Sequence, residues 1–184
     1  MEKIKIAVLV GSLRKESINL KLAKAVEKLA PAHFSFHHVR IGDLPLYTQE
    51  FDSDYPPVCQ RLKQEVAAAD ALLFVTPEYN RSLPGSLKNA LDIGSRPWKE
   101  NSFAGKPAAM LGASPGATGT AMAQQHLRNI LAYLDVALLA QPEVYLKYTD
   151  GLISDDGTVQ QDDTRKFLQK FVDSYVAWVA KVRA

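Results

Sequence analysis

The sequence has 184 residues, of which 47% are hydrophobic and 23% are charged, and its formal net charge is +2. This length allows one domain with a proper core, and the composition is that of an ordinary globular protein. The basic residues are scattered and no apolar run is long enough to cross a bilayer, so neither a nucleic-acid surface nor a membrane span is predicted.

Cysteine and histidine usage gives two further expectations. The single cysteine, Cys59, cannot form an internal disulfide, and the first residues enter an apolar run without a signal-peptide pattern. Both features predict a cytoplasmic protein. The pair His37-His38 lies in an expected strand, where neighbouring side chains point to opposite faces. No metal site is therefore predicted.

Apolar runs alternate with helical patterns along the chain. Residues 4–10 form a β-branched, apolar run that is typical of a buried parallel strand. Apolar side chains at helical spacing follow from Ile18. Further strands are predicted over 34–39, 71–76, 107–112 and 137–146, the last broken at Pro142, and further helices over 58–69, 86–92, 120–134 and 162–183. This alternation predicts an α/β fold with a parallel sheet covered on both faces.

The loop between the first strand and the first helix has the residues of a phosphate site. Gly11 is followed by Ser12, Arg14, Ser17 and Asn19, and a helix N-terminus favours anions. Ser17 is equally suited to be the N-cap of that helix. A Walker lysine is absent, and only one glycine of the dinucleotide fingerprint is present. A terminal monophosphate fits best, and FMN is the obvious candidate.

The loop over 77–85 follows a neighbouring apolar strand and should meet the first loop at the carboxyl edge of the sheet. Two prolines and Gly85 stiffen it, so its backbone could lie edge-on to a flavin ring, with Tyr79 as a flat contact. The alternative is a plain connection with a Pro-Gly helix start. The glycine-rich turn after residue 112 is expected to form a further wall.

A rival interpretation is a serine esterase. Gly112-Ala113-Ser114-Pro115-Gly116 matches the nucleophile-elbow pattern between a strand and a helix. The only later histidine is His126, about two turns into the next helix, and Pro115 lacks the N–H that an oxyanion hole needs. The sequence therefore disfavours catalysis by Ser114.

Two motifs carry a family resemblance: Gly11-Ser12-Leu13-Arg14-x-x-Ser17-x-Asn19-x-x-Leu22-Ala23 and Thr76-Pro77-Glu78-Tyr79-Asn80-x-Ser82-x-Pro84-Gly85-x-Leu87-Lys88-Asn89-Ala90-Leu91-Asp92. Over essentially its whole length the chain resembles the NAD(P)H-dependent FMN reductases, and within them the bacterial chromate/quinone reductase branch. The resemblance implies a flavodoxin-like three-layer sandwich with a five-stranded parallel sheet of order 2-1-3-4-5. Residues 1–184 would then form a single FMN-binding domain.

The resemblance also implies the site and the assembly. The FMN phosphate would be held by Ser12, Arg14, Ser17, Asn19 and Leu20, and the isoalloxazine would be bordered by Pro77, Glu78, Tyr79 and Asn80 and flanked by Ser114 and Gly116. Relatives are dimers or tetramers, for which Arg128, Tyr133 and Glu143 are candidate interface residues. After Asp92 the chain departs from its relatives with Ile93-Gly94, which predicts a more open rim.

The expected reaction is ping-pong. NAD(P)H would give a hydride to flavin N5, and a quinone, chromate or free flavin would then take the electrons. The chemistry is flavin-centred, so no catalytic side chain or metal is predicted. Arg14, and less strongly Arg81 or Arg96, would attract anionic acceptors. The alternative is a flavodoxin-type electron carrier, but such carriers are usually strongly acidic. The sequence does not choose between NADH and NADPH.

Overall fold

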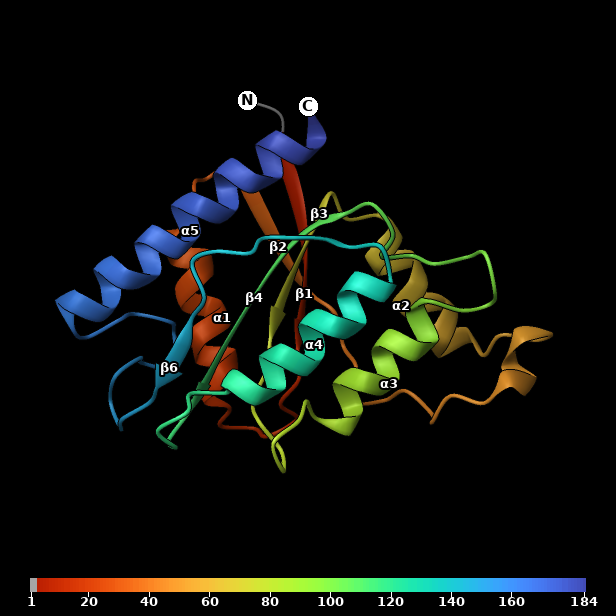
Figure 1. The fold of residues 1–184 in the computed structure, drawn as a ribbon, viewed down its shortest axis with the longest axis horizontal. Helices are drawn as coiled ribbons and strands as arrows, with labels where there is room; N and C mark the ends of the chain where they lie inside the picture. The colour runs from red at the N-terminus through yellow and green to blue at the C-terminus, as the bar shows by residue number, and fades with distance from the viewer. Residues whose placement is uncertain (1–2) are drawn as a thin grey trace.

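The computed structural model describes residues 3–184, so Met1 and Glu2 of the expected domain lie outside it. A parallel sheet lies between two layers of helices (Figure 1). Its strands are β1 (Ile4–Val10), β2 (Phe34–His38), β3 (Ala71–Val75), β4 (Pro107–Ser114), β5 (Ala137–Leu138) and β6 (Tyr145–Lys147). The order β2-β1-β3-β4-β5 confirms the predicted topology.

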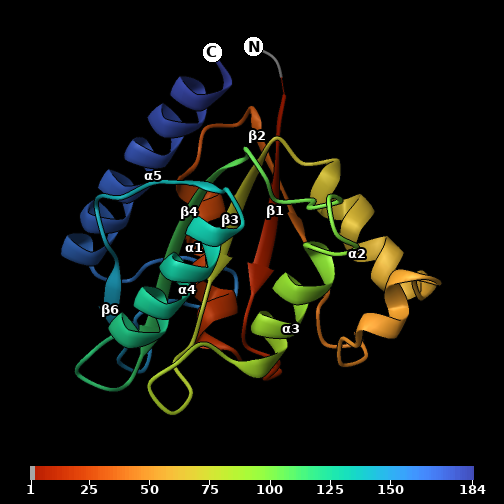
Figure 2. The ribbon, with the colours of Figure 1, turned by 45° about the vertical axis from the view of Figure 1, so that its right-hand side comes forward.

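The strand order places a switch point in the middle of the sheet. The chain moves outward from β1 to β2 and then returns to β3 on the other side of β1, so the loops after β1 and β3 diverge from adjacent strands (Figure 2). Val10 is in register with Val75, and Val75 with Leu111, so the carboxyl ends of three strands lie side by side. Ligands of such sheets bind beyond this edge.

The last strand corrects the prediction of a five-stranded sheet. The stretch read as one broken strand forms two short strands, and both pair in parallel with β4. β5 pairs beside Pro107 and Ala108, and β6 beside Gly112 to Ser114. Pro142 lies in the segment between them, where its missing N–H could not serve a ladder. The described sheet therefore has six strands.

Two helices cover one face of the sheet, and three cover the other. Their bounds are α1 (Ile18–Leu29) and α5 (Asp162–Arg183) on the first face, and α2 (Pro57–Ala67), α3 (Gly85–Gly94) and α4 (Ala121–Tyr133) on the second. A separate apolar core fills each side. In the loop over 41–57, which the sequence predicted as irregular, Gln49–Asp52 form a short 3₁₀ helix.

The two adjacent histidines of β2 diverge as predicted. His37 Nε2 lies 3.6 Å from Glu65 Oε2 on α2, whereas His38 pairs with Glu27 on α1. Within residues 3–184, no group of three or more His, Cys, Asp or Glu side chains is placed to hold a metal ion. In the same range, no helix has the length and apolar character that spanning a membrane requires.

Candidate functional site

A hollow of about 150 Å³ lies at the carboxyl ends of β1, β3 and β4. Three loops far apart in the sequence supply its walls, and most of the predicted cofactor residues line it. The lining residues are Ser12, Arg14, Ser17, Ile18, Asn19, Pro77, Glu78, Tyr79, Ala113, Ser114 and Pro115. Of the predicted set, Leu20, Asn80 and Gly116 are next to lining residues in the chain but do not line the hollow.

The first wall is the loop after β1. Ser17 is the N-cap of α1: it is 3% exposed, and its Oγ accepts a hydrogen bond from the Leu20 N–H at 3.2 Å. Its hydroxyl proton can still be donated to a ligand, because accepting a bond does not consume it. Leu20 therefore contributes an N–H to the cap. The two interpretations of Ser17, cap and ligand residue, are compatible.

Gly11 allows the first and second walls to approach closely. A Cβ at Gly11 would lie 3.2 Å from carbon atoms of both Pro77 and Pro84. The Gly11 N–H donates to the Val75 carbonyl at 2.9 Å, and the Ser86 hydroxyl donates to the Gly11 carbonyl at 3.0 Å. The loop after β1 is thus packed directly on the loop after β3.

Asn19 joins the first wall to β4. Its side chain is 1% exposed, its Nδ2 donates to the Ala113 carbonyl at 3.0 Å, and its Oδ1 accepts from the Ala113 N–H at 2.9 Å. The sequence motif placed Asn19 at the phosphate. In the structure the Asn19 amide holds the start of α1 against the end of β4.

The second wall ends in a tight turn. Tyr79 and Ser82 exchange backbone hydrogen bonds of 2.9 and 3.0 Å, and the residues between them, Asn80 and Arg81, have φ of 50° and 65°. Positive φ is uncommon for residues other than glycine, so this turn is strained. Tyr79 is 48% exposed and leaves part of its ring open beside the hollow.

The Glu78 side chain is hydrogen-bonded to the start of α4. Its Oε2 accepts hydrogen bonds from the backbone N–H groups of Met122 and Ala123, at 3.0 and 3.1 Å. The sequence predicted that Glu78 borders the flavin ring. In the structure one oxygen of its carboxylate is engaged by the N-terminus of α4.

The third wall argues against the esterase. Ser114 Oγ accepts a hydrogen bond from the Gly116 N–H at 3.0 Å, and His126 Nδ1 lies 2.9 Å from Ser82 Oγ. The one histidine that could have served Ser114 is therefore paired with a different serine. Ser114 and Pro115 simply line the hollow.

The three arginines named from the sequence have different surroundings. Arg14 lines the hollow, and Arg81 is exposed on the adjoining turn. Arg96 donates from Nε to the Tyr47 hydroxyl at 2.9 Å and pairs with Asp52. Hydrogen bonds to Tyr47 and Asp52 raise the pKa of Arg96. Its guanidinium holds the loop over 41–57, and it does not line the hollow.

Sequence reasoning missed the role of Asn89. Its Oδ1 accepts from the Tyr47 N–H and its Nδ2 donates to the Pro45 carbonyl, both at 2.9 Å, so it fastens the loop over 41–57 to α3. The only sequence signal was its place in the second motif.

Ile93 and Gly94, from which the sequence predicts a more open rim, are packed inside the chain. Ile93 is fully buried, and a Cβ at Gly94 would lie 2.5 Å from the Phe103 ring, which fills that space. Of the candidate interface residues, Arg128 and Glu143 pair with each other within the chain at 3.3 Å, and Tyr133 is 78% exposed.

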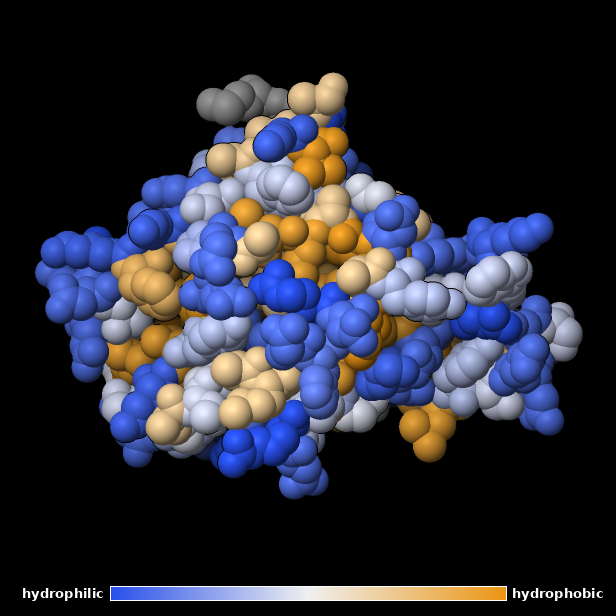
Figure 3. All heavy atoms as spheres, in the orientation of Figure 1, coloured by the Kyte–Doolittle hydropathy of each residue, from blue (hydrophilic) through white to orange (hydrophobic). Residues whose placement is uncertain are grey.

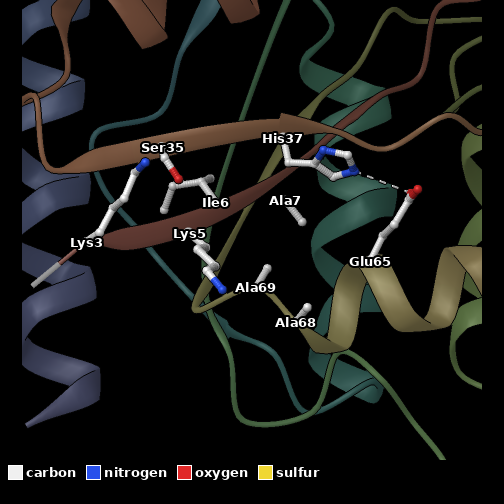
Figure 4. Close-up of a pocket in the computed structure, with 9 residues that line it drawn as sticks. All are labelled: Lys3, Lys5, Ile6, Ala7, Ser35, His37, Glu65, Ala68 and Ala69. Carbon is white, nitrogen blue, oxygen red and sulfur yellow. Dashed lines mark ion pairs between the residues drawn. The ribbon is translucent and has the colours of Figure 1, made fainter.

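A second hollow, of about 310 Å³, lies at the opposite end of the strands. Figure 4 shows Lys3, Lys5 and His37 around it, with Ala68 and Ala69 from the end of α2 and Glu65 pointing toward His37. It forms where α2 ends and leaves the sheet face beside β2 open. It shares no residue with the candidate site.

The residues at the candidate site fit the phosphate end of FMN. Two serine hydroxyls and the Arg14 guanidinium line the hollow beside the first N–H groups of α1, which have no partner within the helix. Glu78 is the one carboxylic acid among the lining residues described, and its charge is directed to α4.

Comparison with known proteins agrees with this geometry. Residues 4–150 match the family model described as NADPH-dependent FMN reductase. The chain is 57% identical over 176 residues to a 2-hydroxy-1,4-benzoquinone reductase of a Burkholderia species, covering 96% of each chain. It is 48% identical over 180 residues to a quinone reductase of Pseudomonas putida, covering 97% of this chain and 96% of that one.

A solved structure extends the likeness to three dimensions. The flavoenzyme NAD(P)H:(acceptor) oxidoreductase FerB of Paracoccus denitrificans superposes with a TM-score of 0.93 at 46% identity, covering 97% of this chain and 98% of that one. The chain belongs to the NADPH-dependent FMN reductase family.

Proposed function

We propose that this protein is an FMN-dependent NAD(P)H oxidoreductase that reduces quinones. The observation that carries the proposal is the convergence of Ser12, Arg14 and Ser17 with the loops after β3 and β4 on one hollow at the switch point. Relatives at 57% and 48% identity are named as quinone reductases, which supports quinones as the acceptor class.

Each wall has a distinct part in holding the cofactor. Ser12, Arg14 and Ser17, together with the N-terminus of α1, would hold the phosphate. The backbone of Pro77 to Asn80 would border the ring, with Ser114, Pro115 and Gly116 on the other side. The half-exposed Tyr79 offers a flat apolar surface where the ring meets solvent.

FMN, when bound, supplies the two-electron chemistry between NAD(P)H and the acceptor. The chain supplies position and electrostatics: the phosphate loop anchors one end, and backbone groups of the stiff second loop address the edge of the ring. No lining side chain among the described residues is placed as a nucleophile with a base beside it, because His126 is paired with Ser82. Reaction therefore depends on geometry more than on acid–base groups.

Anionic acceptors such as chromate, and free flavin, are proposed as secondary substrates. Arg14 at the hollow and the exposed Arg81 on the adjoining turn would favour the approach of negative charge. Competition between chromate and a neutral quinone in steady-state assays tests whether both use the same place.

We further propose a cytoplasmic homodimer or homotetramer. The free, buried Cys59 is consistent with a reducing compartment. Trp98 and Tyr133, which are 67% and 78% exposed, line one surface hollow together, and such grouped apolar exposure supports contact between copies. Figure 3 shows apolar side chains breaking through the polar surface on one face. Light scattering after size-exclusion chromatography tests the assembly.

The decisive experiment is an absorption spectrum of the purified protein, recorded anaerobically before and after NADPH and again after a quinone. We expect flavin bands that bleach with NADPH or NADH and return with the quinone. Bands that do not respond to either nicotinamide nucleotide would favour the electron carrier. A protein that shows no flavin bands even after addition of FMN would overturn the proposal.

A further inference from the structure

We propose that Glu78 and His126 are positioning residues that fasten the ring-bordering loop to α4. The proposal rests on the proposed function, because it concerns the loop that would meet the flavin ring. It assigns to the Glu78 carboxylate a role between two protein elements in place of a contact with the cofactor.

The N-terminus of α4 lacks a cap of its own. The N-cap residue, Thr120, has φ 80° and makes no side-chain hydrogen bond to the helix N–H groups. Its side chain is fully buried, and its Oγ1 accepts from Gln124 Nε2 at 2.9 Å. The first turn of α4 has no acidic residue either. The N–H groups of this turn therefore need an acceptor from elsewhere in the fold.

Glu78 supplies that acceptor from the loop after β3. One carboxylate oxygen receives both the Met122 and the Ala123 N–H, 44 and 45 residues away in the sequence. A negative charge at a helix N-terminus is also favoured by the helix dipole. The same contact fixes the backbone at Glu78, which lines the hollow between Pro77 and Tyr79.

A second contact holds the far side of the turn. Ser82 Oγ lies 2.9 Å from His126 Nδ1, and His126 is four residues, or about one helical turn, beyond Met122. Glu78 and Ser82 thus meet the same side of α4 one turn apart. Between them lie Asn80 and Arg81 with positive φ, a conformation that persists only when its surroundings impose it.

This arrangement has a functional consequence. The N-terminal turn of α4 follows directly from the loop after β4, so Glu78 ties the second wall of the hollow to the third. The gap between those walls, where the ring would lie, is then set before any cofactor arrives. Preorganisation of this kind lowers the cost of binding.

The experiment compares binding of FMN and of riboflavin, which lacks the phosphate, to the apoprotein. Dissociation constants are measured by quenching of flavin fluorescence for wild type, Glu78→Ala, Glu78→Gln, His126→Ala and the double variant Glu78→Ala/His126→Ala. Glu50→Gln, which removes a carboxylate on the exposed 3₁₀ helix, is the matched control. Exchange of the Met122 and Ala123 amide protons is followed in the same apoproteins.

We expect Glu78→Ala to weaken the binding of both FMN and riboflavin by about tenfold. The ratio of the two dissociation constants should stay at the wild-type value, because the lost positioning affects the ring, which both flavins share. Glu78→Gln keeps an acceptor oxygen and should stay within about threefold of wild type. The Met122 and Ala123 amides should exchange faster in Glu78→Ala. The loss of flavin-binding free energy in the double variant should be smaller than the sum of the losses in the two single variants, since both residues hold one loop.

Two results would overturn the proposal. Wild-type affinity for riboflavin in a folded Glu78→Ala protein would show that the contact is structural only. Equal losses in Glu78→Gln and Glu78→Ala, with wild-type exchange of the Met122 and Ala123 amides in both, would place the negative charge at the cofactor and not at α4. If wild type binds neither flavin, the proposed function fails, and the amide exchange then decides whether Glu78 holds α4.

Discussion

Asn19 and Ala113, 94 residues apart in the sequence, are joined by two hydrogen bonds of 2.9 and 3.0 Å that pair one side-chain amide with one peptide unit. The pair is buried, so each of its polar groups depends on the other. The Asn19 side chain bonds the N–H and the carbonyl of Ala113 as the backbone of a neighbouring strand would, and it holds the first turn of α1 against the end of β4.

Replacing Asn19 with alanine should therefore lower the stability of the protein. The substitution leaves the N–H and carbonyl of Ala113 buried without their partner, and we expect a loss of roughly 2–4 kcal/mol in the free energy of unfolding. Urea unfolding of the apoprotein measures it. Asn129→Ala, on the exposed side of α4, should change stability by less than about 0.5 kcal/mol. Equal stability of the two variants would contradict the buried pairing.

Arg14 should discriminate between flavins by their phosphate. We expect Arg14→Ala to weaken the binding of FMN by about tenfold and to leave the affinity for riboflavin unchanged, because a charge-assisted hydrogen bond to a phosphate contributes about 1.5–3 kcal/mol. Lys15→Ala is the matched control, since Lys15 is exposed in the same loop but does not line the hollow. Fluorescence titration of each apoprotein at low and high salt checks the result. A proportional loss for riboflavin would place Arg14 at the ring.

Gly112 should tolerate no side chain. A Cβ there would lie 2.2 Å from Thr120 Oγ1 and 2.3 Å from the Thr76 carbonyl oxygen, and both neighbours are fully buried. We expect Gly112→Ala to destabilise the protein by about 1–3 kcal/mol or more through overpacking. Gly85→Ala meets nothing within 4 Å and begins α3, so it should be neutral or slightly stabilising. Thermal unfolding of the two variants gives the comparison.

Acid should loosen the loop after β6 from α1. Hydrogen bonds from Lys28, Ser154 and the Thr158 backbone hold the pKa of Asp156 well below its usual value, and a hydrogen bond from Lys21 lowers the pKa of Asp155. A lowered folded-state pKa means that the stabilising contribution is fully present above the unfolded value of about 3.9 and is lost progressively as the pH falls from there through the folded-state pKa.

Asp156→Asn isolates this contribution. We expect the variant to be less stable than wild type at pH 7 and the difference to narrow as the pH falls to 3, because the unfolded wild-type carboxylate then gains protons while the folded one stays ionised. Asp156 and its partner Lys28 are both exposed, so added salt should also narrow the difference in stability at pH 7. Urea unfolding at the two pH values measures it. A difference that is independent of pH would mean that the hydrogen bonds of Asp156 matter and its charge does not.

Much of this architecture could be predicted from local pattern. The bounds of β1 and α5 are those that the sequence indicated, because a β-branched run and a long apolar stripe are strong local signals. The broken last strand was predicted, but its separation into β5 and β6 was not, since two- and three-residue strands have no periodicity to detect. The residues proposed for the site were named as a group through their motifs, and most of them line one hollow.

What the sequence could not predict is how individual polar side chains are used. Asn19, Glu78 and Arg96 were expected to face ligands, and each is bonded to a distant part of the fold. Nothing in the local sequence separates an amide that binds a phosphate from one that binds a peptide group. That distinction depends on which strand lies opposite, and therefore on tertiary structure.

The hollow takes its walls from the ends of β1, β3 and β4, the last of which ends at Ser114. During synthesis, the nascent chain therefore cannot form the complete hollow, the proposed cofactor site, until well over half of it has left the ribosome and the central strands have paired. Flavin can therefore bind only late, after the strands have paired in the correct order. The free energy of binding then adds to the free energy of unfolding of the folded protein. Cellular flavin supply should accordingly alter the lifetime of this protein more than its rate of folding.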